Sequence, residues 1–197
     1  MGRLAIIDSG GANIASLQFA IERLGVEAVL TTDPAALAAA SHVILPGVGA
    51  AADCMARLQS LNLVDTIRSL KQPLLGICVG MQLMFEGSEE GNVSCLGILP
   101  GRVQRFPNIA GKPVPHMGWN QLQVTRPTPL LTGLTVDDYV YYVHSYAAPV
   151  GADTVATTDY STTFSAAVQR GNVYGVQFHP ERSARAGAHI LANFLKV

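Results

Sequence analysis

A cysteine lies between two glycines at the point where an apolar run ends, in Gly76-Ile77-Cys78-Val79-Gly80. Residues 74–77 are predicted to form a buried strand and a helix is expected from Met81 onward, which leaves Cys78 on the turn between them. Small flanking residues allow a nucleophile elbow, whose central residue takes a strained backbone and projects its side chain outward. A helix N-terminus there would favour the thiolate, which is the attacking form of cysteine. A small buried cysteine at a tight turn is the alternative.

A histidine and a glutamate, His179 and Glu181, are separated by one proline near the end of the chain. In an extended stretch, residues two apart face the same way. Glu181 could then accept the imidazole N–H of His179 while the other ring nitrogen faces a nucleophile. The pair therefore predicts a base and the residue that orients it.

Two glycines around one valine, Gly47-Val48-Gly49, follow a short apolar run and Pro46. Such glycines let a peptide plane rotate until an N–H points into a cleft, although an ordinary strand-to-helix turn would use the same residues. A second polar loop, residues 87–91, is expected at the same edge, where Glu90 is either solvated or able to receive an ammonium group. Nucleophile, base, orienting residue and amide donor are the parts that acyl transfer from an amide requires.

Alternating strands and helices must position these groups. Strands are predicted at residues 3–8, 26–31, 42–45 and 74–77, with helices at 14–24, 35–40 and 50–70, the last broken near Asn62. Such alternation predicts parallel crossover units and an α/β fold, with helices on both faces of the sheet and functional groups at its carboxyl edge.

From Gly101 the pattern changes to period-two segments that predict further strands. These are residues 102–106, 119–124, 139–147, 153–158, 163–169 and 173–178, and a final helix is expected at 186–195. We expect some of these strands to extend the sheet in the antiparallel sense. The predicted fold class is a three-layer, doubly wound, mixed but mostly parallel sheet.

Composition narrows the function. The chain has 197 residues, which suits a single domain spanning residues 1–197, and a net charge of −1 gives no reason to expect nucleic acid or an anionic membrane. Cys54, Cys78 and Cys95 include no Cys-x-x-Cys pair, which argues against a disulfide framework or structural zinc and for a reducing, cytoplasmic location. Neither a dinucleotide fingerprint nor a phosphate loop occurs, so no cofactor or metal is expected.

Several longer motifs carry a family resemblance. They are residues 46–49, 76–85, 115–120 (Pro-His-Met-Gly-Trp-Asn), 144–146 (His-Ser-Tyr) and 175–183, which include Gln-Phe-His-Pro-Glu-Arg-Ser. The chain resembles the class I, or triad, glutamine amidotransferases, and more narrowly the family of glutaminase subunits of imidazole glycerol phosphate synthase. Ala184 is a small departure, since this family often has glycine there.

The resemblance implies that Cys78 attacks the glutamine carboxamide, with His179 shuttling protons and Glu181 orienting it. It further implies an oxyanion hole made by Val79 and by Gly47, Val48 or Gly49 after a peptide flip. Gln82, Glu90, His144, Ser145 and Tyr146 match glutamine-binding positions. Asn13, Trp119, Tyr141 and Arg182 match positions facing a separate (β/α)₈ cyclase, which would receive the ammonia and make imidazole glycerol phosphate and aminoimidazole carboxamide ribotide in histidine biosynthesis.

Other classes of function remain open. A cysteine peptidase or γ-glutamyl hydrolase would share the nucleophile and histidine, but would not need residues 115–120 or a partner face. The glutaminase subunit of another synthase is a further alternative. A catalytically silent binding subunit would be expected to have lost part of the triad, whereas Cys78, His179 and Glu181 are all present.

Overall fold

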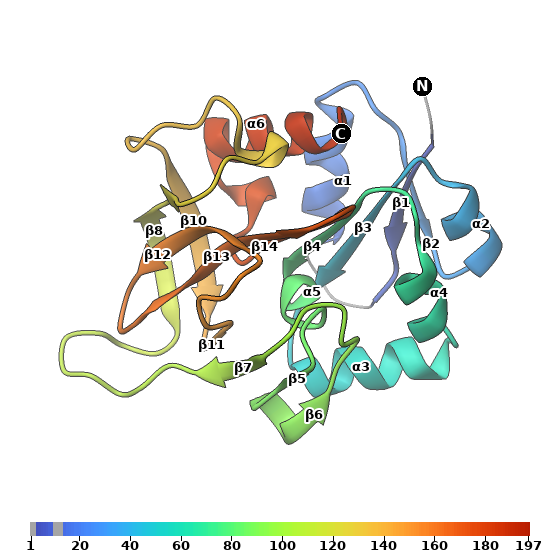
Figure 1. Cartoon of the computed structure of the whole chain (residues 1–197). Helices are drawn as coiled ribbons and strands as arrows, with labels where there is room; N and C mark the ends of the chain where they lie inside the picture. The colour runs from blue at the N-terminus through green and yellow to red at the C-terminus, as the bar shows by residue number, and fades with distance from the viewer. Residues whose placement is uncertain (1–2, 10–13) are drawn as a thin grey trace.

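The largest sheet of the computed structural model, which describes residues 3–9 and 14–197, contains parallel and antiparallel strands (Figure 1). Within those residues its order is β2-β1-β3-β4-β14-β13-β12-β9. The strands are β1 (Leu4–Ile7), β2 (Ala28–Thr31), β3 (His42–Gly47), β4 (Leu74–Cys78), β9 (Gln123–Val124), β12 (Thr154–Asp159), β13 (Thr163–Arg170) and β14 (Val173–Val176). The pairings from β2 to β14 are parallel, and those from β14 to β9 are antiparallel. The predicted mixed, mostly parallel sheet is confirmed.

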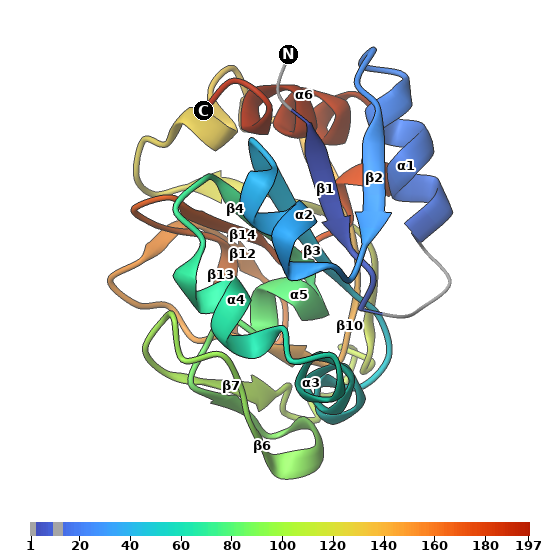
Figure 2. The same cartoon turned by 90° about the vertical axis from the view of Figure 1, so that its right-hand side faces the viewer.

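Helices cover the parallel strands on both faces. Figure 2 shows α1 on one side of β1 and β2, with α2 and α4 on the other. Strands covered in this way need apolar side chains facing both directions, which is why every residue of β1, β4 and β14 is buried. The helices are α1 (Ile14–Glu22), α2 (Pro34–Ala39), α3 (Ala51–Ser60), α4 (Val64–Ser69), α5 (Val79–Gln82) and α6 (Ala184–Phe194).

The predicted break in the long helical segment is confirmed. α3 ends at Ser60 and α4 begins at Val64, and between them Asn62 takes a φ of 56°, which no residue within a right-handed helix adopts. The last helix starts at Ala184, two residues before the predicted start. Ala184 has a φ of 45°, in the left-handed region that glycine enters without steric cost, which gives a physical reason for glycine at this position.

The second half of the chain confirms that some of its strands extend the main sheet in the antiparallel sense, and it also contains strands that form separate sheets. β8 (His116–Gln121) and β10 (Tyr139–His144) pair with each other, and a third sheet has the order β11-β7-β5-β6. Its strands are β5 (Gly87–Ser88), β6 (Val93–Ser94), β7 (Arg102–Arg105) and β11 (Tyr146–Ala147), and short 3₁₀ turns lie at η1 (Glu90–Asn92), η2 (Pro129–Leu131) and η3 (Pro180–Arg182).

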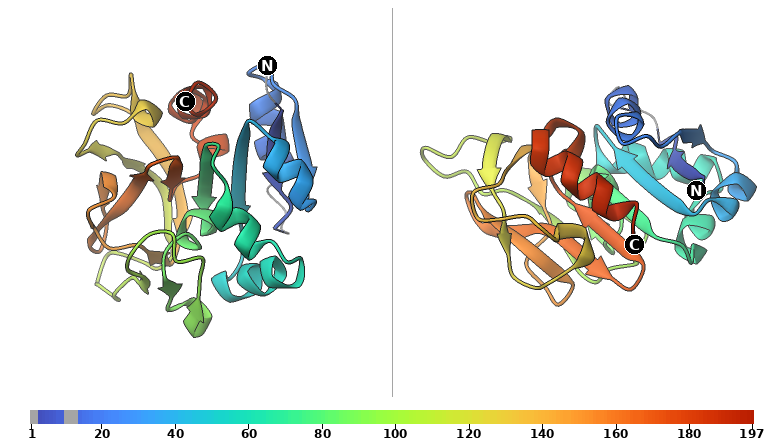
Figure 3. Two further views of the ribbon diagram at one scale, coloured as in Figure 1. Left: turned by 45° about the vertical axis from the view of Figure 1, so that its right-hand side comes forward. Right: turned by 90° about the horizontal axis from the view of Figure 1, so that it is seen from above.

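Two predicted strands are each divided in two, and both divisions have a physical reason. The segment predicted at 119–124 splits at the buried Leu122 into β8 and β9, which join different sheets. The segment predicted at 139–147 splits at Ser145, whose carbonyl oxygen accepts a hydrogen bond from the Phe106 N–H at 3.0 Å. Figure 3 shows β8 and β10 beside, and separate from, the parallel part of the main sheet. β8 and β10 therefore form a two-stranded sheet of their own.

Among the described residues, no helix is long and apolar enough to cross a membrane. Cys54, Cys78 and Cys95 are all buried free thiols. In the same described part of the chain, no group of three or more His, Cys, Asp or Glu side chains is arranged to hold a metal ion.

Candidate active site

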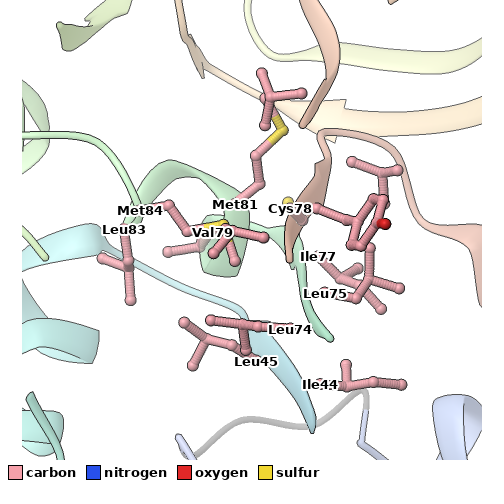
Figure 4. Packing of buried hydrophobic residues seen from close by; sticks show 14 of the residues in the cluster. Ile44, Leu45, Leu74, Leu75, Ile77, Cys78, Val79, Met81, Leu83 and Met84 are labelled. Carbon is pink, nitrogen blue, oxygen red and sulfur yellow. The ribbon is translucent and has the colours of Figure 1, made fainter. Parts of the chain in front are cut away.

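Cys78 occupies a strained turn between β4 and α5. Its backbone has φ 54° and ψ −113°, a conformation that a non-glycine residue adopts only when its surroundings force it to. Figure 4 shows Cys78 among buried side chains of β4 and α5, including Ile77 and Val79. A Cβ atom at Gly80 would collide with the Leu45 carbonyl oxygen, and one at Gly76 would come 2.7 Å from Met84 Cε. The predicted elbow geometry at Cys78 is confirmed.

The helix after the elbow is shorter than the prediction required. α5 begins at Val79 rather than Met81 and contains four residues. One turn of helix aligns few peptide dipoles, so its contribution to thiolate stability is smaller than that of a full helix. Stabilisation of a thiolate at Cys78 would therefore depend mainly on the side chains around it.

The fold brings His179, the predicted base, to Cys78. Its Nδ1 lies 2.8 Å from Glu181 Oε1, and the two side chains are 5% and 3% exposed. The predicted His179–Glu181 contact is present, but the reason given for it is wrong. Residues 180–182 form the 3₁₀ turn η3 and are not extended, so it is the turn that folds Glu181 back toward the ring. Ser183 fixes this turn, since its Oγ donates to the His179 carbonyl oxygen at 2.7 Å and accepts from the Tyr141 N–H at 2.9 Å.

The electrostatics of His179 favour its charged form. Burial by itself lowers its pKa, but hydrogen bonds to Cys78 and Glu181, together with the negative charges of those groups, outweigh burial and raise the pKa to about 10. A protonated imidazole beside a sulfur atom is the arrangement in which a thiolate is stabilised. Cys78, His179 and Glu181 thus have the geometry of a nucleophile, its base and the residue that orients the base.

A cavity of about 360 Å³ lies in front of these residues. Cys78 and His179 line it, while Glu181 lies behind His179 in the wall of a smaller neighbouring pocket. The oxyanion and glutamine-binding residues predicted from the sequence also line the large cavity. They are Gly47, Val48, Gly49, Val79, Gln82, Glu90, His144, Ser145 and Tyr146. Pro115 and Val143, which were not predicted as site residues, also line the cavity.

Gln82 and Tyr146 are bonded to each other in the wall of this cavity. Gln82 Nε2 donates to the Tyr146 carbonyl oxygen at 2.8 Å, and His144 Nδ1 lies 2.8 Å from the same oxygen. A carbonyl oxygen has two lone pairs, so that of Tyr146 is fully engaged within the protein. Substrate contacts from residues 144–146 must therefore come from other groups than this carbonyl.

Glu90 faces the cavity from η1 and is partly buried. Its Oε2 accepts the Ala51 N–H at 2.8 Å, at the start of α3. Burial raises the pKa of Glu90, and the Ala51 hydrogen bond opposes that shift. A half-desolvated carboxylate in a cavity wall is suited to receive a cationic group.

The segment predicted to supply an oxyanion donor, residues 46–49, is held by two hydrogen bonds. The Pro46 carbonyl oxygen accepts from Ser9 Oγ at 2.6 Å, and the Val48 carbonyl oxygen accepts from Cys54 Sγ at 3.4 Å. Gly49 has a φ of 84°, and a Cβ atom there would meet nothing within 4 Å. The glycine is therefore required by backbone conformation and not by space.

His144, which lines the cavity, pairs with His116 behind it, a pair that the sequence did not single out. His116 Nδ1 and His144 Nε2 are 3.1 Å apart, and both rings are buried. Burial lowers the pKa of His116 to about 4 and that of His144 to about 3. Their sequence separation is 28 residues, and only the pairing of β8 with β10 brings them together.

Three of the residues predicted to face a partner lie together, Trp119 on β8, Tyr141 on β10 and Arg182 on η3. The Trp119 and Tyr141 rings meet edge to face with centroids 5.9 Å apart, and the Arg182 guanidinium lies 4.7 Å from the centre of the Tyr141 ring. Trp119 is 52% exposed and Met117, on the same face of β8, is 63% exposed. Asn13 lies outside the described residues.

Known sequences match this chain over its full length of 197 residues. The family model for glutamine amidotransferase class-I matches residues 5–197. The chain is 55% identical over 197 residues to the imidazole glycerol phosphate synthase subunit HisH of Xanthomonas axonopodis pv. citri, covering 100% of this chain and 98% of the relative. It is 51% identical to the subunit of the same name from Xylella fastidiosa strain Temecula1, with the same coverage.

Solved structures agree on the fold. A crystal structure of a glutamine amidotransferase superposes with a TM-score of 0.75 at 19% identity, covering 98% of this chain and 97% of that one. The structure of PurLQS from Thermotoga maritima gives a TM-score of 0.71 at 20% identity, covering 100% of this chain and 99% of the matched chain. The likeness shows the α/β amidotransferase fold.

Proposed function

Because the chain belongs to the class I glutamine amidotransferases, and within them to the family of glutaminase subunits of imidazole glycerol phosphate synthase, we propose that it hydrolyses glutamine through Cys78, His179 and Glu181. The observation that carries the proposal is the strained Cys78 hydrogen-bonded to His179 at one cavity, with Glu181 behind the His179 ring. The proposal treats residues 1–197 as one amidotransferase domain, which the match over residues 5–197 supports.

The chemistry follows from these positions. His179 takes the thiol proton, and the Cys78 sulfur attacks the side-chain carboxamide carbon of glutamine. The tetrahedral intermediate collapses when His179 returns the proton to the leaving nitrogen, which releases ammonia and leaves a glutamyl thioester. His179 then removes a proton from water, the resulting hydroxide attacks the thioester carbonyl, and glutamate leaves as the sulfur is reprotonated.

The negative oxygen of each tetrahedral intermediate needs hydrogen-bond donors. We assign the Val79 N–H as one donor and an N–H from Gly47, Val48 or Gly49, after rotation of a peptide plane, as the second. The positions of these residues at the cavity wall support the assignment. A missing donor of this kind typically slows the reaction by about 10²- to 10³-fold, so the chain by itself should be a poor glutaminase.

The cavity matches the size and charge of a free amino acid. Its volume of about 360 Å³ lies at the lower end of the range of small-molecule sites, which starts at about 300 Å³. Gln82 and Glu90 are assigned to the polar end of the substrate, Glu90 to its α-ammonium group, together with the segment His144-Ser145-Tyr146. No cofactor or metal is part of this mechanism.

The ammonia is assigned to a partner. We propose that it passes to a separate (β/α)₈ cyclase subunit in a heterodimer, which makes imidazole glycerol phosphate and aminoimidazole carboxamide ribotide for histidine biosynthesis. Relatives at 51–55% identity are named as subunits of that synthase. The exposed face of Trp119, Tyr141 and Arg182 supports docking there, and Asn13 is assigned to the same face from the family pattern.

The test replaces Cys78 with alanine and measures synthesis by the reconstituted pair. Glutamine-dependent synthesis should vanish, while synthesis from added ammonium salts should continue, since the cyclase needs only ammonia. Glutamine-dependent turnover by Cys78→Ala would exclude Cys78 as the nucleophile. Glutamine hydrolysis is also measured for the chain alone, with the cyclase, and with the cyclase plus its nucleotide substrate. A rate that stays constant across the three would instead indicate a stand-alone hydrolase.

A further inference from the structure

Two buried glutamines form a hydrogen-bonded chain that ends on the nucleophile. Gln82 Nε2 donates to the Tyr146 carbonyl oxygen at 2.8 Å and to Gln177 Oε1 at 2.9 Å. Gln177 Nε2 in turn lies 3.8 Å from Cys78 Sγ. Gln82 is 2% exposed and Gln177 is fully buried, and Gln177 does not line the cavity. Gln177 therefore reaches the sulfur from within the protein.

One backbone group determines the direction of both amides. The Tyr146 carbonyl oxygen can only accept, so Gln82 must face it with its amide nitrogen. The second N–H of that nitrogen needs an acceptor, and Gln177 supplies Oε1. With its oxygen turned toward Gln82, Gln177 must present its amide nitrogen to Cys78. The Tyr146 carbonyl, at the far end of this series of hydrogen bonds, thus determines that Gln177 presents an N–H donor to the sulfur.

The sheet register explains why Gln177 lies beside Cys78. β14 pairs parallel with β4, with Val176 opposite Ile77. The residues that follow these two are Gln177 and Cys78, which therefore lie side by side. The Gln177 N–H donates to the Ala166 carbonyl oxygen at 2.9 Å, which holds this backbone against β13. His179 follows two residues later, so one segment carries both the base and the amide donor.

The same hydrogen bonds determine which polar group of Gln82 is available to a ligand. Both of its N–H groups are engaged by the protein, so the group left for a substrate is its Oε1 acceptor. An acceptor suits the ammonium or carboxamide N–H groups of glutamine and cannot bind a carboxylate.

On the basis of the proposed function, we propose that Gln177 is a positioning residue for glutamine hydrolysis. Its amide N–H stabilises the Cys78 thiolate, and its Oε1 holds Gln82 with the Gln82 oxygen available to the substrate. An N–H donor to an anionic sulfur is stronger than one to a neutral thiol, so its effect falls on the charged form.

The first test follows the thiolate without any substrate. The rate of Cys78 alkylation by iodoacetamide is measured against pH in the full chain, with the labelled peptide identified by mass spectrometry. Gln177→Met retains the side-chain length but has no amide. Its alkylation rate at pH 7 should fall about tenfold, the effect of one hydrogen bond to the sulfur, and the curve should move to higher pH. A curve identical to that of the wild type would overturn the proposal.

The second test separates the two roles of Gln177 by steady-state kinetics with the reconstituted partner. Gln177→Glu retains an acceptor for Gln82 but brings a carboxylate to the sulfur, so kcat should fall at least tenfold while KM changes less than threefold. Gln177→Met removes both contacts and should lower kcat and raise KM together. Unchanged kcat in Gln177→Glu would overturn the proposal, and this variant also serves if Gln177→Met does not fold.

The control is a buried amide elsewhere. Asn193 Nδ2 donates to the carbonyl oxygens of Leu130 and Thr132, at 3.1 and 2.8 Å, on the side of α6. Asn193→Leu should lower stability and leave the alkylation curve of Cys78 in place. If it shifts that curve as far as Gln177→Met does, the effect is general loosening and the proposal is wrong. A wild-type chain that shows no glutaminase activity even with its reconstituted partner would refute the proposed function alone, since alkylation requires no glutamine.

Discussion

The replacement of Glu181 by glutamine tests how much of the proposed catalysis depends on one carboxylate. Glu181 Oε1 and His179 Nδ1 are 2.8 Å apart and their side chains are almost fully buried, so solvent screens the pair little. Two unit charges at that separation attract by about 6 kcal/mol at an effective dielectric constant of about 20. A glutamine oxygen would recover about half of this as a neutral hydrogen bond, which leaves a loss of about 3 kcal/mol, or roughly 10²-fold in rate.

The geometry of the pair adds a second effect. If the glutamine turns its NH₂ toward Nδ1, the ring must carry its proton on the other nitrogen, which then cannot take the proton of Cys78. The charge change also lowers the pKa of His179 from about 10, since Glu181 helps to raise it. The alkaline limb of the kcat profile should therefore move to lower pH.

The assay is glutamine hydrolysis by the chain with its cyclase partner and that partner's ligand, measured from pH 6 to 10. Asp138→Asn is the matched control, because Asp138 is a similarly buried carboxylate that accepts from the Thr135 N–H at 2.8 Å and pairs with Arg185. It should lower stability without changing kcat. Activity of Glu181→Gln within threefold of the wild type, with an unshifted pH profile, would refute the role of Glu181.

Three further predictions follow from the same structure. Between pH 7 and pH 5 the unfolded chain takes up protons on His116 and His144 that the folded chain does not bind, so stability present above pH 6.5 is lost on acidification, by about 2 kcal/mol for each residue. Urea unfolding at both pH values should show a smaller loss of stability for His144→Asn than for the wild type. An equal loss would contradict the lowered pKa of His144. Gly49→Ala should cost about 1 kcal/mol of backbone strain and slow glutamine hydrolysis. Gly171 also has a positive φ and open space for a Cβ, so Gly171→Ala should cost similar stability but leave the rate unchanged. Equal rates in both variants would exclude Gly49 from the site. Trp119→Ala should weaken cyclase binding at least tenfold in a titration and leave Cys78 alkylation by iodoacetamide unaffected, because this exposed ring lies on β8 and outside the cavity. Unchanged affinity would exclude this face as the cyclase-binding surface.

The sequence alone determined the parts of the site that depend on neighbours in the chain. Gly76 and Gly80 around Cys78 can be recognised because the close approach of strand and helix at an elbow is a local requirement. The alternating βα pattern predicted the parallel half of the sheet for the same reason, since crossover units are built from consecutive elements. His179 and Glu181 were paired correctly although the turn that joins them was not foreseen.

Tertiary structure decided the contacts between distant segments. The Gln82–Gln177 bond spans 95 residues, and its existence depends on the register between β4 and β14, which no local pattern encodes. The period-two pattern of 119–124 and 139–147 predicted strands but not their sheets, because pairing partners are selected by the packing of whole faces. The sequence therefore specified the reacting groups, while the strand register determined which amide meets the Cys78 sulfur.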